Sequence, residues 1–293
     1  MPADFKILRL SDKNYPILLT EIPVPPGTIY YKGVLPDSDQ PHIAIVGTRK
    51  ATATGLAIAK KLARELAEAG AAIVSGLALG IDAAAHEGAL AGKGKTIAVL
   101  PVGINRIYPA QNENLAKQIL EMGGGIISEY EPGKPSLKNH FLERNRIVSG
   151  LSVGVVVVEA PEKSGALSTA AHALEQNREV FVVPGPVNHD NYKGAHALLR
   201  AGARLVTNAA EILDDLNLAP AHTQQTLLYM KEAGLNDDQR AVLAVLRSSG
   251  EPVDVDKIRD LTKIDISVVN RNLTLLLIQG IVKEESGRYF LAR

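Results

Sequence analysis

The fold is decided by residues 43–75, which read IAIVGTRKATATGLAIAKKLARELAEAGAAIVS. The stretch begins with the apolar, β-branched run 43–47, which is typical of a buried strand. A helix is predicted next by three apolar residues at four-residue spacing, Ile58, Leu62 and Leu66. Gly70 ends this helix, and a second β-branched run, 72–75, follows it. The order of strand, helix and strand predicts one βαβ unit with parallel strands.

The same alternation continues along the chain to residue 216. Further β-branched runs predict strands at 96–100, 125–128, 153–159 and 180–183. We therefore predict an α/β fold with a Rossmann-like, doubly wound parallel sheet over residues 42–216. Residues 1–41 hold several prolines that prevent a regular helix, and we expect them to pack on the sheet as an N-terminal strap.

The pattern changes after residue 216, and residues 217–234 are predicted to be a linker. Residues 235–293 are predicted to form a small C-terminal winged-helix domain, because three amphipathic helical segments precede two short strands, 281–284 and 288–291. Gly280 is expected to end the third helix, and Ser286 and Gly287 are expected in the turn between the strands.

Three polar residues near the start of the third helix, Asn270, Arg271 and Asn272, are candidates for contacts in a DNA major groove. The charge of this domain argues against strong duplex binding, since nine basic residues are balanced by nine acidic ones. Contact with protein, or weak accessory DNA binding, is therefore favoured over specific recognition of a duplex.

The composition of the 293 residues excludes several classes of function. With 32 basic and 32 acidic residues the formal net charge is +0, so no long-range field draws the chain to duplex DNA or to a membrane. The chain has no Cys, which rules out disulfides, thiolate metal sites and thiol catalysis. The sequence has neither an apolar signal-peptide region nor an apolar run of about 18 residues, and we expect a cytoplasmic protein without a membrane partner.

Three loops that follow predicted strands are rich in small and polar residues. They read GTRK at 47–50, SGLALG at 75–80 and EAPEKSGA at 159–166. The carboxyl ends of parallel strands share one edge of a sheet, so we expect these loops to meet there and to bind anions such as phosphates. Any one of them alone is explained equally well by a tight turn. Neither GxxxxGKS/T nor GxGxxG occurs, and we predict no cofactor.

The stretch GKPSLKNHFLERNRIVSG, residues 133–150, is the most suggestive of nucleic-acid binding. It holds four basic residues, one acid and a single aromatic ring, Phe141. Cations in a groove follow the phosphates of a single strand, while a ring stacks on an unpaired base. The alternative for Phe141 is a purely structural place in the core. Arg144 and Arg146 lie two residues apart on the predicted helix, so only one is expected to face the site easily.

No catalytic or metal-binding pattern stands out. His86 lies one turn after Asp82, and Glu175 lies three residues after His172, but neither pair has the further ligands of a metal site such as HExxH. Structural roles are favoured for these pairs, and no GxSxG elbow accompanies the histidines. The residues therefore offer no clear candidate for catalysis, and we predict that the protein holds no metal.

Several strings together resemble the DNA-processing protein A family of bacteria, also called DprA or Smf. In the order of the family they are IVGTR at 45–49, IVSGLALGID at 73–82, YP at 108–109, SEY at 128–130, RNRI at 144–147, VEA at 158–160, SG at 164–165 and PG at 184–185. The resemblance extends over about residues 15–213, and the tail resembles the family's winged-helix domain.

The resemblance implies a single-stranded DNA-binding protein that is not an enzyme, protects incoming DNA, forms a homodimer and loads the RecA recombinase during natural transformation. By matching motif it places DNA contacts on Arg49, Lys134, Phe141, Arg144, Asn145, Ser164 and Gly165. With the neighbouring loop positions, the predicted DNA-binding set is Gly47, Thr48, Arg49, Ser75, Gly76, Lys134, Phe141, Arg144, Asn145, Arg146, Ser164 and Gly165. The sterile-alpha-motif-like domain of some members is not expected before residue 15.

Three positions depart from the family pattern. Pro101 stands where a Gly is usual, Leu142 where a Pro follows the Phe, and Ala166 where a Ser follows the SG string. Ala166 lacks a hydroxyl that would donate to a phosphate, and Leu142 alters the tilt expected of Phe141.

Two alternatives from other classes stay open. The loops also resemble those of the lysine-decarboxylase-like phosphoribohydrolases, which cleave nucleoside monophosphates, but the PGGxGTxxE string of those enzymes corresponds here to KSGALST at 163–169. In the other alternative, the winged helix is a duplex-binding regulator whose α/β domain senses a ligand.

Overall fold

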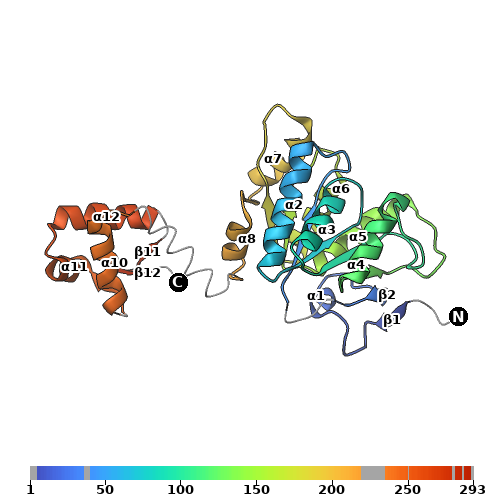
Figure 1. Ribbon diagram of the computed structural model, residues 1–293, viewed down its shortest axis with the longest axis horizontal. Helices are drawn as coiled ribbons and strands as arrows, with labels where there is room; N and C mark the ends of the chain where they lie inside the picture. The colour runs from blue at the N-terminus through green and yellow to red at the C-terminus, as the bar shows by residue number, and fades with distance from the viewer. Residues whose placement is uncertain are drawn as a thin grey trace. The chain divides into compact units, whose positions relative to one another are not determined.

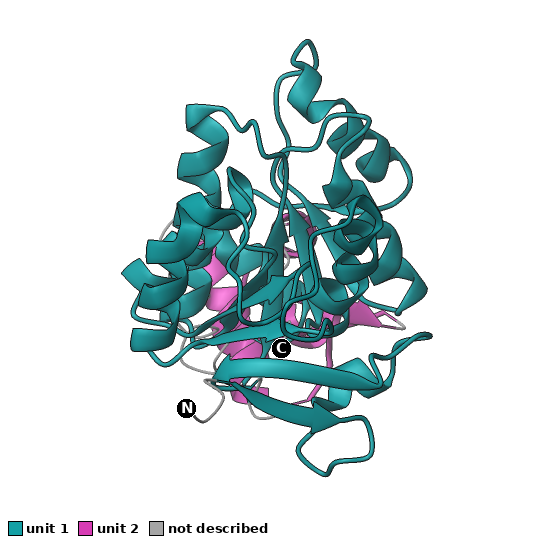
Figure 2. Cartoon of the chain, turned by 90° about the vertical axis from the view of Figure 1, so that its right-hand side faces the viewer, with its two compact units in different colours: residues 1–219 teal, residues 220–293 magenta. Residues whose placement is uncertain are grey.

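A computed structural model of the protein describes residues 5–35, 40–218, 235–249, 251–278, 281–285 and 287–291. The chain divides into two compact units, residues 1–219 and 220–293 (Figure 2). The boundary falls in the stretch predicted to be a linker, 217–234, of which residues 219–234 lie outside the described residues.

The described part of the first unit is built on a nine-stranded sheet with the order β1-β2-β6-β5-β4-β3-β7-β8-β9. Figure 1 labels the first two of these strands, near the N-terminus. The bounds are β1 Lys6–Arg9, β2 Thr28–Gly33, β3 His42–Val46, β4 Ala72–Ser75, β5 Thr96–Leu100, β6 Gly125–Ser128, β7 Gly154–Val157, β8 Glu179–Val182 and β9 Arg204–Leu205. Strands β3 to β9 are parallel, while β2 pairs antiparallel with β6 and with β1. The predicted Rossmann-like parallel sheet is thus confirmed.

The central strand β3 is buried along its whole length. It pairs with β4 on one side, Ile43 opposite Ile73, and with β7 on the other, Ile43 opposite Gly154. Because side chains alternate along a strand, Ile43 and Ile45 belong to one core, while Ala44 and Val46 belong to the other. Residues on both faces are apolar, as expected of a parallel strand covered on both sides.

Helices cover both faces of the sheet. The core that contains Ile43 also receives residues of α2 Ala53–Glu68, α3 Ile81–Ala91 and α8 Ala209–Asp215, and α4 Glu113–Glu121 packs beside α3. The opposite core receives residues of α1 Ile17–Thr20, α5 Lys138–Gly150, α6 Gly165–Glu175 and α7 Lys193–Arg200. The short 3-10 helices η1 Ala110–Asn112 and η2 Asp190–Tyr192 precede α4 and α7.

The N-terminal segment, which we expect to pack on the sheet as a strap, lies at one edge of the sheet. It adds two antiparallel strands, β1 and β2, to the β6 edge of the sheet, with the short helix α1 between them. The buried Tyr15 hydroxyl donates to the Pro26 carbonyl at 2.6 Å, which ties the segment between the strands together. Pairing with β6, and not a local sequence pattern, produces these two strands.

The second unit contains α10 Asp237–Ser249, β10 Val253–Asp254, α11 Val255–Thr262, α12 Ile266–Ile278, β11 Val282–Glu285 and β12 Arg288–Leu291. Its strands form a sheet of order β10-β12-β11, and it has an apolar core of its own. Three helices and a β-ribbon are the predicted winged-helix elements, and β10 is an addition. The expected helix end at Gly280 and the expected turn residue Ser286 lie outside the described residues.

One of the three polar residues predicted for a DNA groove lies instead in the core of this unit. The Asn272 side chain is fully buried, and neither its amide nitrogen nor its oxygen has a hydrogen-bond partner among the described residues. Asn270 and Arg271 are exposed. The reason is helical spacing, since Asn272 lies three residues after the buried Val269 and beside the buried Leu273.

In the described parts of both units, no helix combines the length and the apolar character needed to cross a bilayer.

Candidate functional site

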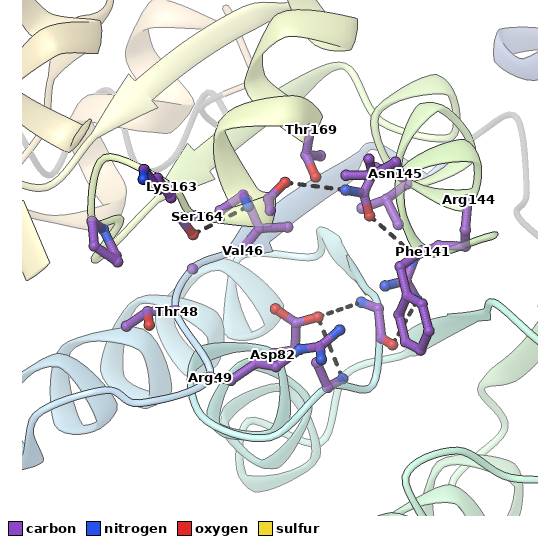
Figure 3. Close-up of a pocket in the computed structure, with 18 residues that line it drawn as sticks. Val46, Thr48, Arg49, Asp82, Phe141, Arg144, Asn145, Lys163, Ser164 and Thr169 are labelled. Atoms are coloured by element: carbon purple, nitrogen blue, oxygen red, sulfur yellow. Dashed lines mark hydrogen bonds between the residues drawn. The ribbon is translucent and has the colours of Figure 1, made fainter. Parts of the chain in front are cut away.

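A pocket of about 320 Å³ opens at the carboxyl ends of β3 and β7 (Figure 3). Its lining comes from the loops after β3, β4 and β7 and from helices α5 and α6. In the sheet, β4, β5 and β6 follow β3 on one side, and the chain then returns to place β7 on its other side. This reversal of strand order is where open parallel sheets bind their ligands.

Arg49 lies at the rim of the pocket, in the loop after β3. Its side chain is exposed, and within the described residues it makes neither a hydrogen bond nor a salt bridge. The guanidinium carbon lies 4.9 Å from the centroid of the Phe141 ring, which is half-buried on α5. A cation over a ring is attracted by the negative face of the ring, so the two side chains hold each other at the pocket mouth.

Arg144 forms the floor of the pocket and is 5% exposed. Its Nη1 donates to the carbonyls of Gly76, at 2.7 Å, and of Val99, and its Nε donates to Oδ1 of Asn145 at 3.3 Å. Burial lowers the pKa of Arg144 to about 10, although the nearby Asp82 carboxylate acts against this shift. Arg144 therefore stays a cation at neutral pH and joins α5 to the ends of β4 and β5.

Asp82 braces the same loop from α3. Its Oδ2 accepts from the backbone N–H of Gly76 at 3.1 Å and of Ala78 at 3.4 Å, and burial raises its pKa. A Cβ at position 76 would lie 2.5 Å from Nη2 of Arg144, so only glycine allows the guanidinium to come this close. The loop after β4 is thus fixed by Asp82 at the Gly76 amide and by Arg144 at the Gly76 carbonyl.

The N-terminus of α6 forms the opposite side of the pocket. Ser164 is the capping residue, and its Oγ accepts from the Ala166 N–H at 3.3 Å. Asn145 of α5 donates to the Gly165 carbonyl at 3.1 Å, and Lys163 precedes the helix as an exposed cation. In Figure 3, Lys163 and Ser164 lie across the pocket from Arg49. A helix N-terminus beside a lysine favours a negatively charged ligand.

A buried carboxylate, Glu159, holds the loop that carries Arg49. It accepts from the Thr52 N–H at 3.0 Å, from the Thr52 hydroxyl at 2.5 Å, from Asn191 at 2.8 Å and from the Tyr192 hydroxyl at 3.1 Å. Burial acts to raise the pKa of Glu159, but these hydrogen bonds to the charged form outweigh burial and lower the pKa. Glu159 fixes the start of α2, three residues beyond Arg49.

Most members of the predicted DNA-binding set lie together in this pocket. The nine that line it are Gly47, Thr48, Arg49, Gly76, Phe141, Arg144, Asn145, Ser164 and Gly165. Phe141 is therefore a wall of the pocket and not the buried core residue of the alternative interpretation.

Three members of the predicted set do not line the pocket. Ser75 is buried, and its hydroxyl donates to the Ile45 carbonyl at 2.7 Å. Arg146 forms a bidentate pair with Glu129 at 2.9 and 2.7 Å and leaves α5 in another direction. Lys134 is exposed in the loop before α5.

The pocket also contains residues that were not in the predicted set. Lys163 lies in the loop after β7, and Thr169 lies in the following helix, α6. Asp82 is one of the pair Asp82 and His86, for which a structural role is favoured from the sequence. Lys163 was detectable, because it is a cation in a loop that follows a strand. The approach of Asp82 to the Gly76 loop depends on the tertiary fold and had no local signal.

The family model described as DNA recombination-mediator protein A matches residues 6–217, which is most of the chain. The chain belongs to this family. The resemblance to DNA-processing protein A that the sequence motifs indicate is thereby confirmed.

Three members of the DNA-processing protein A family illustrate the similarity. Protein Smf of Synechocystis is 36% identical, and the alignment covers 98% of this chain and 80% of that protein. The X-ray structure of DNA processing protein A from Streptococcus pneumoniae is 41% identical, with a TM-score of 0.68, and covers 72% of this chain and 74% of that one. A structure of DNA processing protein A from Helicobacter pylori, described for its single-stranded DNA binding mode, is 36% identical, with a TM-score of 0.64. The match covers 72% of this chain and 95% of that one.

Proposed function

We propose that the pocket binds single-stranded DNA, and that the protein protects this DNA and passes it to a recombinase without chemical turnover. The observation that carries the proposal is the pairing of Arg49 with Phe141 at the pocket mouth, 4.9 Å from guanidinium carbon to ring centroid. A cation that has no salt bridge among the described residues and a ring beside it are what a phosphate and an unpaired base require.

The charges of the pocket support this assignment. Arg49, Arg144 and Lys163 contribute three cations to the lining, against the single carboxylate of Asp82, which is engaged by backbone N–H groups. The N-terminus of α6 adds further positive potential. Although the whole chain has a formal net charge of +0, the lining is cationic, so a phosphate is attracted locally and not by long-range steering.

An unpaired strand fits the pocket better than a duplex. The ring of Phe141 lines a concave site at the strand ends, and a base must leave its partner before its face can meet a ring. The Helicobacter pylori relative described for single-stranded DNA binding supports the same ligand class. The absence of chemical turnover rests on the resemblance to the family and on Asp82 being held by the backbone.

Binding is tested by fluorescence anisotropy with a labelled oligonucleotide of ten or more bases and with its duplex. We expect micromolar or tighter binding of the single strand, weakened by salt, and little binding of the duplex. The combined change Arg49→Ala and Phe141→Ala is expected to reduce affinity roughly 100-fold, because a charged contact and a stacking contact are lost together.

A matched control is Arg64→Ala, which removes one exposed arginine of α2 that pairs with Glu68 outside the pocket lining. This variant is expected to bind the single strand within twofold of the parent. If the double variant bound like the parent, the pocket would not be the DNA site.

The partners RecA and a second copy of the chain are proposed from the resemblance to the family. Loading is measured as ATP hydrolysis by RecA on single strands coated with a single-strand binding protein, where we expect the protein to shorten the lag. Sedimentation equilibrium is expected to give about twice the chain mass of 31.2 kDa. An unchanged lag would contradict loading, and a mass of one chain would contradict the dimer.

A further inference from the structure

A second, smaller cavity of about 70 Å³ adjoins the pocket. It shares five lining residues with the pocket, among them Arg49, Phe141 and Arg144. The rest of its lining is apolar or aromatic and consists of Leu79, Pro101, Tyr108 and Pro109. Phe141 and Arg49 therefore form a shared wall, with the cationic pocket on one side and an apolar slot on the other.

The ring of Tyr108 is the distinctive feature of this slot. It contacts the ring of Phe141 edge to face, with centroids 5.4 Å apart and planes at 69°. An edge-to-face pair uses at most one face of the two rings, so ring surface stays available to another planar group. Tyr108 is half-buried and Leu79 is 40% exposed, so the apolar surface is open to solvent at the rim.

The geometry points to a binding slot for one unpaired nucleobase, with Tyr108 as the stacking residue. This inference rests on the proposed single-strand binding of the adjoining pocket and adds a second base position to it. The slot has an apolar wall and opens to solvent at its rim, so the face of a base can lie against Tyr108 while the rest of the nucleotide stays outside. Arg49 stands beside it to meet the phosphate that joins this base to the next. We define the Tyr108 slot as the cavity lined by Leu79, Pro101, Tyr108 and Pro109 beside Phe141.

The chemistry of the slot also defines what it does not distinguish. A ring and apolar side chains contact the face of any base equally, whereas recognition of one base needs donors and acceptors at its edge. The side chains contributed only by the slot include one polar atom, the Tyr108 hydroxyl. We therefore expect the slot to increase affinity for single strands with little preference among bases.

A competing explanation is that Tyr108 only supports the Phe141 ring by packing against it. Tyr108 packs against the apolar cluster that contains Leu77 and Leu100, which is consistent with a support. The two explanations predict different results for Tyr108→Leu, because leucine keeps apolar bulk against Phe141 but offers no ring face. They also differ for an oligonucleotide without bases.

The first experiment uses fluorescence. The chain has no Trp, so Tyr108→Trp introduces the single indole of the protein. We expect a 12-residue thymidine strand to quench the indole emission of this variant, because a stacked base lies against the indole. An abasic strand of the same length and charge is expected to leave the emission unchanged. Equal quenching by both strands, or by neither, would overturn the assignment.

The second experiment measures affinity for the same thymidine strand by anisotropy. Tyr108→Leu is expected to weaken binding roughly 5- to 100-fold, the range of one lost base stack, while Tyr108→Phe is expected to stay within twofold of the parent. Thermal melting confirms that each variant is folded. With the abasic strand, Tyr108→Leu and the parent are expected to bind equally.

The outcomes separate this inference from the function on which it rests. If Arg49→Ala with Phe141→Ala abolished binding while Tyr108→Leu bound like the parent, the pocket would stand and the Tyr108 slot would be wrong. If all of these variants bound like the parent, both assignments would be wrong.

Discussion

At the floor of the pocket Arg144 and Asp82 are buried and bind backbone groups, whereas at its rim Arg49 and Lys163 are exposed and have neither hydrogen bonds nor salt bridges within the described residues. Both pairs lie in the same small site. One cation in a binding pocket can thus be committed to the fold, while another is left for the ligand. Floor substitutions should therefore change stability, and rim substitutions should change binding.

The largest effect is expected at the floor, from Arg144→Met. Without the guanidinium, the carbonyls of Gly76 and Val99 lose a donor, and the buried Asp82 keeps its two backbone N–H bonds but loses the attraction of the nearby cation. We expect the free energy of unfolding to fall by about 3 to 5 kcal/mol. Urea denaturation followed by circular dichroism measures this loss. Arg49→Met is the control at the rim, and a comparable loss there would remove the distinction between floor and rim.

Gly76→Ala tests the close approach at the floor more gently. The new methyl group would meet the Arg144 guanidinium, which cannot move freely because it is buried and bonded to two carbonyls. We expect a loss of about 1 to 3 kcal/mol in the same urea experiment. Gly165→Ala is the matched control, since a Cβ there has no atom within 4 Å. Equal stability of the two variants would contradict the tight fit around Gly76.

The hydrogen bonds of the Glu159 carboxylate, which fix the loop that carries Arg49, predict that the stability of the protein depends on pH. The pKa of Glu159 is lower in the folded protein than in the unfolded chain. Its contribution to the free energy of unfolding is therefore complete above the ordinary pKa range of glutamate, and is lost as the pH falls through the pKa of the folded state. Glu159→Gln is expected to be less stable than the parent at pH 7, and the difference should narrow as the pH falls below the ordinary range. Urea midpoints between pH 7 and pH 3 test this, and a gap that stayed constant would refute it.

The smallest effect is expected at the rim, from Lys163→Ala. Loss of one phosphate contact should lower the slope of log affinity against log salt concentration by about 0.7, with unchanged stability. Anisotropy titrations at several salt concentrations measure the slope. Lys60→Ala, which removes an exposed lysine paired with Glu87, is expected to leave the slope unchanged. The same decrease in both variants would indicate a nonspecific effect of charge.

Much of the fold was predictable because its signals are local. The β-branched run that contains Ile43 and Ile45 and the spacing of Leu62 and Leu66 identify a buried strand and its helix without tertiary information. Strands β1 and β2 had no such signal, since their pairing with each other and with β6 creates them. The burial of Asn272 was predictable in hindsight, because the apolar spacing around it already places it on the core face.

The sequence predicted which loops form the site, but not which of their side chains face it. Strand ends in a parallel sheet meet by topology, which brought the loops of Arg49 and Ser164 together as expected, while Phe141 reaches them from α5. The sequence left open which of Arg144 and Arg146 would face the site. A helix rotates about 200° over two residues, so the two side chains point apart, and tertiary contacts with Gly76 and with Glu129 decide between them.

The Asp82 carboxylate has one more consequence, because it occupies the N–H groups of Gly76 and Ala78 that a turn of this kind would otherwise offer to an anion. It acts as a built-in substitute for a phosphate. An external phosphate is therefore excluded from these N–H groups and is left with Arg49 at the rim and with the side of the pocket near α6. A strand in this pocket would meet two unlike edges, a polar one for its backbone and an aromatic one for its bases, and that asymmetry would orient it.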